Sequence, residues 1–455
     1  MLKFNVLKFN ESHNGLASLN SLAGMWRDAF HGLSRFEAGM LGFWLAGPFI
    51  YLIERSPADI WLSIIVVVFI GRSIVQHDWG WWRLAWVKAV AVFYLTITIA
   101  SMFSVLWQDA LIECLIWLRF PLFAAAVVWW LASTPARLGL MLWSMGLAAM
   151  LMTFILLGEI WYKLDSFSPE HSYSFRLEGP YGDLLPGAFL GKAMLPLAVV
   201  AASFALSYEK GRVLPTKALG FGVIVFILVV MTLVTGERVN TAVIGSASIV
   251  AAVVTAMRYK TWRRLMTYVV LGMVGLGVVF VLYSDMISSH IIGQSLATFG
   301  DFFQSPHWSS YHPGLVAAWH YPLTGIGAGM HRYLCPGLLE LPSVFPGVIQ
   351  CWNHPHQFYV QLAGETGVFG LLAGVGMIGL IIAASRIHRP TMHKHKNNHW
   401  LLILRPWIIP LVIFFPQPNF DFFAQWHSLF MWFALSLALA LARVGNQINR
   451  QTKNK

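Results

Sequence analysis

The sequence predicts an all-α, polytopic membrane protein, and three observations lead to this prediction. Of the 455 residues, 57% are hydrophobic and only 11% are charged. The mean hydropathy of the chain is +0.63. The apolar residues gather in about twelve stretches, each close to the roughly 20 residues that a helix needs to cross a bilayer. An ordinary soluble domain cannot bury so much apolar surface, so we exclude that class.

These stretches set the order of the predicted elements. Residues 1–36 are polar and mildly basic, with apolar residues at helical spacing, so we expect either an interfacial amphipathic helix or a loosely ordered tail, and no cleaved signal peptide. Residues 37–284 hold roughly nine predicted spans, residues 356–443 hold about three more, and residues 444–455 form a polar tail. The centres of the predicted spans lie near Trp44, Val66, Val92, Ala124, Leu147, Leu197, Phe226, Ser248, Met273, Leu372, Pro410 and Met431.

The formal net charge of +11 is distributed as an orientation signal. Most Lys and Arg residues fall in the connections on the side of both termini, which the positive-inside rule assigns to the cytoplasm. We therefore expect no nucleic-acid partner. The few basic residues in the opposite connections are Arg55, Lys163, Arg176, Arg238 and Arg332.

Two of the outward connections are long, residues 159–186 and residues 285–355, and long ordered loops on a compact membrane body usually carry function. In the second loop we predict a short helix, Pro313–Trp319, followed by a Gly-rich turn, His320–Gly329. We interpret this turn as structural, because no Lys-Ser/Thr follows it as in a phosphate-binding P-loop. Cys335 and Cys351 lie in the same loop, where an oxidising compartment favours a disulfide; two free thiols are the alternative.

The second loop ends in the sequence CWNHPHQFYVQLAGETGVFGL, in which a polar stretch becomes a hydrophobic helix. His354 and His356 lie at the changeover, where an imidazole is a suitable general base near neutral pH. Gln357 follows, and Gly367 and Gly370 lie further along the same helix. The alternative interpretation is a helix start with an N-terminal histidine and small residues that let another helix approach.

Arginines flank the segments that lead toward His356. Arg176, Arg238 and Arg332 lie in outward connections, and Arg119 lies in the outer part of a predicted span. Guanidinium groups bind phosphate in a bidentate manner, so these four residues are candidate diphosphate contacts. For Arg238 the alternative is a local ion pair with Glu237. The outward acidic residues, Asp421 among them, are scattered and form no DxD or HExxH pattern, so we expect no metal and no cofactor.

Four segments together carry a resemblance to a known family: FRLEGPYGD, TGERVNTA, HYPLTGIGAG and HPHQFYVQLAGETGVFG. The chain resembles the O-antigen ligase and polymerase superfamily of bacterial inner-membrane transferases of lipid-linked glycans. The signature His-Gln-x9-Gly-x-x-Gly begins at His356, and the resemblance extends from about Arg176 to Gly370. It implies about twelve transmembrane helices with one large periplasmic loop before helix 10 and both termini in the cytoplasm.

The resemblance also implies the reaction and the roles of the residues. The reaction is metal-independent, inverting transfer of a glycan from undecaprenyl diphosphate to an acceptor hydroxyl. By motif, His356 would be the general base and Arg238 a diphosphate contact, while Arg176 matches less specifically. The family arginine before the Gly-rich turn is missing, since SSYHPGLVAAW stands there, and Arg332 is the candidate replacement. His354 either orients His356 or shapes the loop.

The acceptor decides between related functions. An O-antigen ligase transfers the glycan to a lipid A–core sugar at the periplasmic face of the inner membrane. An O-antigen or exopolysaccharide polymerase uses the same donor with a second lipid-linked repeat, and a protein O-oligosaccharyltransferase is a third variant. A transporter or flippase for the lipid-linked sugar is the alternative from another class, and it would not depend on a single base.

Overall fold

The computed structural model describes residues 22–163, 176–182, 185–207, 215–282, 302–347, 350–388, 400–418 and 421–453. Parts of several predicted features lie outside these ranges. They are the first 21 residues of the N-terminal segment, residues 164–175 and 183–184 of the first long loop, residues 285–301 and 348–349 of the second, residues 208–214, 283–284 and 389–399 of the connections, and residues 454–455 of the polar tail. Within the described ranges all regular secondary structure is helical.

The helices follow the predicted order along the chain. The first half comprises α1 (Leu22–Phe30), α2 (Arg35–Leu45), α3 (Gly47–Ile50), α4 (Arg55–Val75), α5 (Ala85–Met102), α6 (Trp107–Ala126), α7 (Pro135–Lys163), α8 (Pro186–Ala188) and α9 (Leu195–Leu206). The second half comprises α10 (Pro215–Val234), α11 (Arg238–Tyr259), α12 (Trp262–Leu282), α14 (Pro306–His320), α15 (His331–Leu338), α16 (Phe358–Ala384), α17 (Ile408–Ile413) and α18 (Gln425–Lys453). Two π-helical turns, Val127–Leu131 and Phe189–Ala193, follow α6 and α8.

In the described ranges, 8 helices are long and apolar enough to cross a membrane, or up to 9 when the bent pair Pro186–Ala193 and Leu195–Leu206 is taken as one span. The chain is thus an all-helical, multi-pass membrane protein, but the predicted number of about twelve spans is not reached. Prolines account for two of the differences, because proline lacks the N–H that a helix interior needs. Near Trp44 the helix is broken between α2 and α3, where Pro48 opens the new turn. Near Pro410, α17 has only 6 residues.

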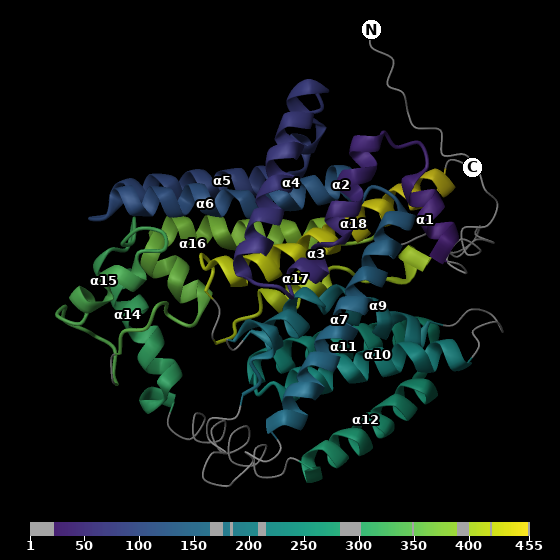
Figure 1. Ribbon diagram of the computed structural model, residues 1–455. Helices are drawn as coiled ribbons and strands as arrows, with labels where there is room; N and C mark the ends of the chain where they lie inside the picture. Colours follow the sequence, from purple (N-terminus) through teal and green to yellow (C-terminus); the bar gives the residue numbers. More distant parts are fainter. Residues whose placement is uncertain are drawn as a thin grey trace.

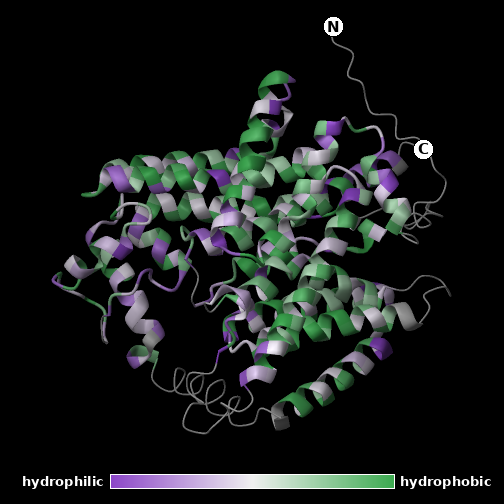
Figure 2. Ribbon diagram, viewed as in Figure 1, coloured by the Kyte–Doolittle hydropathy of each residue, from purple (hydrophilic) through white to green (hydrophobic). Residues whose placement is uncertain are grey.

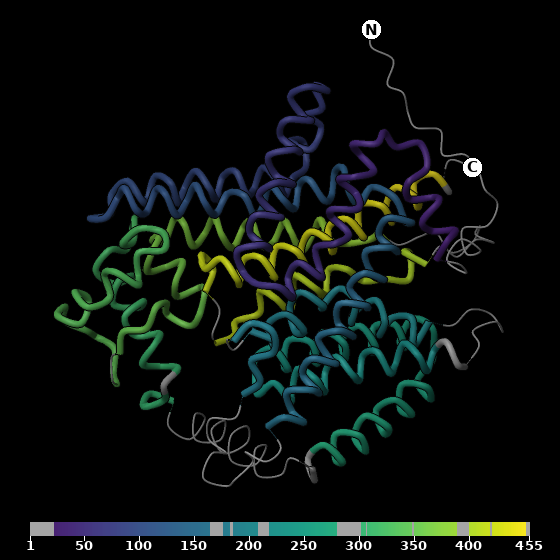
Figure 3. Tube along the Cα trace, in the orientation of Figure 1, coloured from purple at the N-terminus to yellow at the C-terminus, as the bar shows by residue number. Residues whose placement is uncertain are grey.

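The long helices form two groups around a central one (Figure 1). Helices α5, α6 and α16 run side by side, and α9, α10 and α11 form the second group. The central helix is α18: within Gln425–Gln451, 94% of the residues in an 18-residue apolar window are buried, against 6% of those in the Trp262–Val279 stretch of α12. The trace shows α12 lying apart from the rest of the body (Figure 3).

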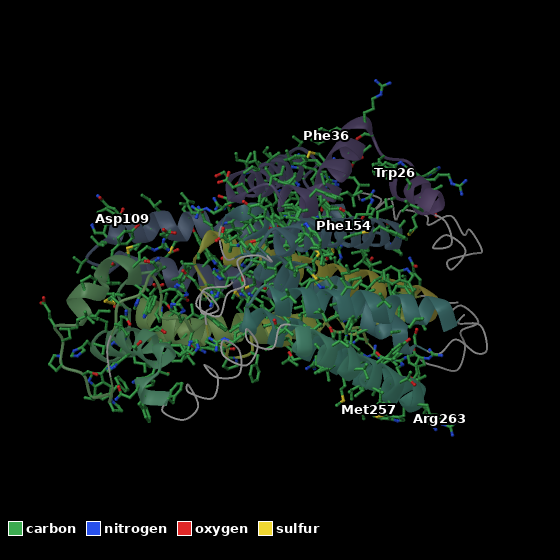
Figure 4. All side chains as sticks on the ribbon, turned by 60° about the horizontal axis from the view of Figure 1, so that its bottom comes forward. Trp26, Phe36, Asp109, Phe154, Met257 and Arg263 are labelled. Carbon is green, nitrogen blue, oxygen red and sulfur yellow. A yellow bond between two sulfur atoms is a disulfide. The ribbon has the colours of Figure 1, made fainter. Side chains whose placement is uncertain are left out.

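Helices α14 and α15 and the start of α16 lie at one end of the molecule (Figure 1). Helices α14 and α15 cover the start of α16 there, and hydrophilic segments are frequent at this end and rare along the long helices (Figure 2). Asp109, at the start of α6, lies at the same end, whereas Trp26, Met257 and Arg263 lie toward the other end (Figure 4). The second long loop therefore covers the end of the helical body where His356 lies.

Candidate active site

The start of α16 is a tight turn that presents two histidines. Gln357 caps the helix, since its Oε1 accepts a hydrogen bond of 2.8 Å from the Val360 N–H. His356, one residue earlier, has a φ of 43°, a left-handed conformation that is uncommon for residues other than glycine. Its ring stacks on that of His354, with centroids 4.3 Å apart and planes inclined by 22°. Backbone strain of this kind is frequent at functional sites.

The Gly-rich turn is part of the scaffold that holds α16. The Gly327 N–H donates to the Glu365 carbonyl at 2.8 Å, and the Val368 N–H donates to the Pro322 carbonyl at 2.8 Å. These bonds require α16 to break at Gly367, which has φ 67° and ψ −172°. A Cβ atom at Gly367 would overlap the Leu323 carbonyl. The first glycine of the Gly-x-x-Gly signature is therefore the position where this turn inserts against the helix.

A buried carboxylate joins the turn, α15 and α16. Glu365 Oε2 accepts from the Gly329 N–H at 2.8 Å, and Oε1 accepts from the His331 N–H at 3.1 Å. Gln361 donates to the same carboxylate from Nε2 at 3.3 Å. Because donors from three segments converge on Glu365, the start of α15, and with it Arg332, is fixed relative to α16.

A second buried carboxylate, Asp421, lies behind His354. Its Oδ1 accepts from Gln361 Nε2 at 2.9 Å and from the N–H groups of Phe423 and Ala424 at 3.0 and 3.1 Å. Its Oδ2 faces His354 Nδ1 at 3.8 Å. Burial raises the pKa of Asp421, but the combined effect of groups such as His354 and Gln361, which lower it, is larger. The pKa of Asp421 is therefore below its ordinary value, and the carboxylate is charged at neutral pH.

The pKa of His354 is lowered. Burial is the largest cause; Asp421 opposes it, and the charges of Arg332 and Lys192 lower the pKa further. His354 is therefore neutral at pH 7, beside a charged carboxylate. A neutral imidazole with its Nδ1 toward Asp421 directs the rest of the ring, and the stacked His356, away from that carboxylate.

His331, in the first turn of α15, adds another buried imidazole to the group. It is 1% exposed, and neither ring nitrogen has a hydrogen-bond partner among the described residues. Burial lowers the pKa of His331 to about 4, with a further lowering by His354. His427, in α18, also lies close, with its ring 6.3 Å from that of His354.

Sequence reasoning missed part of this group. In the sequence, Asp421 is one of several scattered acidic residues, whereas the structure places its carboxylate next to His354. His331 and His427 carry no local pattern that distinguishes them from other histidines. Only the packing of α15, α16 and α18 brings them together, and no spacing along the chain indicates it.

Two of the predicted arginines lie around Glu237, just before α11. Burial raises the pKa of Glu237, while Asn240, Lys192 and Arg176 act to lower it. Lys192 is 1% exposed and lies in the π-helical turn Phe189–Ala193. The charge of Lys192 acts on both Glu237 and His354, so this residue belongs to the surroundings of both groups.

Arg238 and Arg332 connect these groups to the covering loop. Burial lowers the pKa of His307 in α14, and the charge of Arg238 lowers it further. Arg332 acts on Asp421 and His354 from α15. The charge of Arg332 thus acts on the histidine group, whereas the charge of Arg176 acts on Glu237 and on Arg238.

Arg119 has a different partner from the predicted one. Its Nη2 lies 2.7 Å from Asp59 Oδ1, which joins α6 to α4. Its guanidinium also lies over the ring of Phe120, 4.9 Å from the centroid. An ion pair between two helices accounts for a charge in this position without a substrate phosphate.

A disulfide ties two parts of the site together. Cys335, in α15, is bonded to Cys351, with an S–S distance of 2.05 Å. The bond links the helix that bears His331 and Arg332 to the segment that bears His354 and His356. The remaining cysteine, Cys114, is a buried free thiol.

The site offers imidazoles, carboxylates and guanidinium groups for proton transfer and anion binding. In the described part of the chain, no group of three or more His, Cys, Asp or Glu side chains is arranged to hold a metal ion. A half-buried imidazole next to an anchored, charged carboxylate suits general base chemistry. Guanidinium and ammonium groups nearby suit a substrate that develops negative charge.

Comparison with known proteins gives one match. Residues 223–375 match the sequence model of a family described as O-Antigen ligase. The matched stretch runs from α10 into α16 and contains Arg238, Arg332 and both stacked histidines. No curated protein matches the chain.

Proposed function

We propose a function from the premise that residues 223–375 belong to the O-antigen ligase family. The protein is a membrane-embedded glycosyltransferase that moves a glycan from undecaprenyl diphosphate to the hydroxyl of a lipid A–core sugar. The reaction takes place at the periplasmic face of the bacterial inner membrane. Within the superfamily, a protein that uses this acceptor is an O-antigen ligase.

In the proposed mechanism, His356 removes the proton from the acceptor hydroxyl. The hydroxyl oxygen attacks the anomeric carbon of the donor sugar, and the bond from that carbon to the diphosphate breaks, with its electron pair leaving on the phosphate oxygen. Direct attack inverts the anomeric configuration. A positioned general base typically contributes about 10²–10⁴-fold to the rate.

The cationic residues act on the leaving group. A diphosphate diester carries two negative charges, and a further charge develops as the glycosidic bond breaks. In this proposal Arg238 and Arg176 bind the diphosphate, and Arg332 stabilises charge beside the histidines. Guanidinium groups suit this role because they keep their charge and bind phosphate with two parallel N–H donors.

One observation carries the proposal: the rings of His354 and His356 stack at 4.3 Å, with Asp421 Oδ2 at 3.8 Å from His354 Nδ1. Asp421 is anchored by three N–H donors, so it directs His354, and His354 in turn supports the ring of His356. This is a base held by an orienting group, as general base catalysis requires. His354 and Asp421 are thus positioning residues and His356 the catalytic residue.

The test is glycan transfer in vitro with purified protein, lipid-linked donor and lipid A–core acceptor. We expect His356→Ala to lower the rate at least 100-fold with unchanged membrane levels. Arg238→Lys should also slow transfer, because an ammonium group does not reproduce the bidentate fork. Transfer should persist in EDTA. Full activity of His356→Ala would show that the base is assigned wrongly.

The same assay separates the ligase from its relatives. The assay offers lipid A–core and a second lipid-linked repeat as acceptors in parallel. A ligase transfers the glycan to lipid A–core, whereas a polymerase transfers it to the lipid-linked repeat. A deletion strain gives the cellular counterpart. Unattached long polymer indicates a lost ligase, and lipopolysaccharide with a single attached repeat indicates a lost polymerase.

A further inference from the structure

An open aromatic surface lies directly against His356. The side chain of Trp352 is 41% exposed. Its ring meets that of His356 edge to face, with centroids 5.4 Å apart and planes inclined by 82°. Because this accessible ring touches the proposed base, it offers an aromatic surface to a substrate that binds there.

The segment that carries Trp352 is held firmly although it is not helical. Cys351, immediately before it, is bonded to Cys335 of α15. On the other side, Pro355 is buried against α14, where a Cβ added to Gly314 would lie 3.0 Å from the Pro355 side chain. The Gln357 cap then begins α16. With anchors on both sides, the indole is positioned before any ligand arrives.

The chemistry of this surface fits a sugar ring. A pyranose carries its hydroxyls around the rim and presents C–H groups on its faces, and these hydrogens are attracted to the negative face of an indole. Asn353, next to Trp352, is exposed. Its amide can donate to and accept from the hydroxyls at the rim.

We propose that Trp352 and Asn353 form the subsite for the acceptor sugar. Trp352 stacks on the pyranose ring and so presents one of its hydroxyls to His356. The acceptor is favoured over the donor because its hydroxyl must reach the base, whereas in the proposed mechanism Arg176 and Arg238 hold the donor diphosphate. This subsite depends on the proposed transferase function.

The kinetic test varies donor and acceptor separately with purified protein. Trp352→Ala should raise the KM for the acceptor about tenfold, with the donor KM unchanged, because a lost stacking contact costs about a factor of ten. Trp352→Phe should recover most of the loss. Trp319→Ala is the matched control: Trp319 is 60% exposed on α14 of the same loop, and its loss should leave the acceptor KM unchanged.

Binding without turnover gives an independent readout. In the background of His356→Ala, saturation-transfer NMR with a soluble core oligosaccharide should show contacts from one face of the sugar ring. These contacts should disappear on Trp352→Ala and persist on Trp319→Ala. Folding of each variant is checked by its melting temperature and by the absence of new free thiols.

Three outcomes would overturn the subsite: an unchanged acceptor KM in Trp352→Ala, a rise in the donor KM alone, or an equal effect of Trp319→Ala, which would indicate anchoring at the membrane interface. The proposed function fails by other results, namely no transfer by the wild-type protein or full transfer by His356→Ala. The two failures are therefore distinguishable.

Discussion

Replacing Gly367 by alanine tests whether the break in α16 holds the site together. At φ 67° and ψ −172° the backbone of this residue lies in a region that is essentially restricted to glycine. Forcing a side chain into it costs about 1–3 kcal/mol. The new Cβ would also overlap the Leu323 carbonyl and lie 2.7 Å from the Thr324 nitrogen. Moving that turn away weakens the bond from Val368 to Pro322, worth about 0.5–1.5 kcal/mol.

Together these effects predict a loss of about 2–4 kcal/mol for Gly367→Ala. The turn it displaces also supplies the Gly329 N–H to Glu365, so the start of α15 should shift and glycan transfer should fall. The measurements are the melting temperature in detergent and the rate of transfer. Gly376→Ala, in the same helix and with nothing within 4 Å of its Cβ, is the control and should be neutral or slightly stabilising. If both variants melt and turn over like the wild type, the reasoning about the Gly-x-x-Gly signature is refuted.

Three further predictions concern charge, the disulfide and Arg119. Burial lowers the pKa of His331 from 6.5 to about 4, so between these values the unfolded chain binds a proton that the folded chain does not. Stability should therefore rise from pH 4 to pH 6.5, by up to about 3 kcal/mol, and His331→Asn should reduce the rise in melting temperature over this range. Cys335→Ser opens a loop with a sequence separation of 16 and should cost about 3 kcal/mol. The matching Cys351→Ser should give the same loss, and unequal losses would count against a shared bond. Asp59→Asn with Arg119→Met should melt at a higher temperature than either single variant, because each single change leaves one half-buried charge unpaired. Additive losses in a double-mutant cycle would argue against the pair.

Much of the fold and of the site could be predicted from local features. The hydropathy of α4 through α7 predicts spans because each is a long unbroken apolar stretch. The position of His356 follows from the change from polar to apolar residues at the start of α16. A disulfide between Cys335 and Cys351 could be predicted because both lie in a loop that we assigned to an oxidising compartment, and the structure contains this bond.

What could not be predicted depends on packing between distant segments. Asp421 is one acid among several in the sequence, and only the approach of α18 to α16 places it behind His354. Arg119 has the side chain expected of a phosphate contact, but in the structure its guanidinium forms an ion pair with Asp59 on a neighbouring helix. The predicted number of about twelve spans is not confirmed in the described part of the chain, and one reason is that hydropathy averages over prolines such as Pro48, where the hydrogen-bonding pattern of a helix has to restart.

The position of α12 has a practical consequence for handling the protein. Since only 6% of the residues in its Trp262–Val279 stretch are buried, most of this helix would face acyl chains in a bilayer. Helices in a bilayer gain little from apolar contact with one another, so this helix keeps its place through weak packing and a matching hydrocarbon thickness. Exchange of lipid for detergent therefore changes the surroundings of α12 far more than those of α18. Nanodiscs of defined chain length are the preparation in which this part of the protein is best preserved.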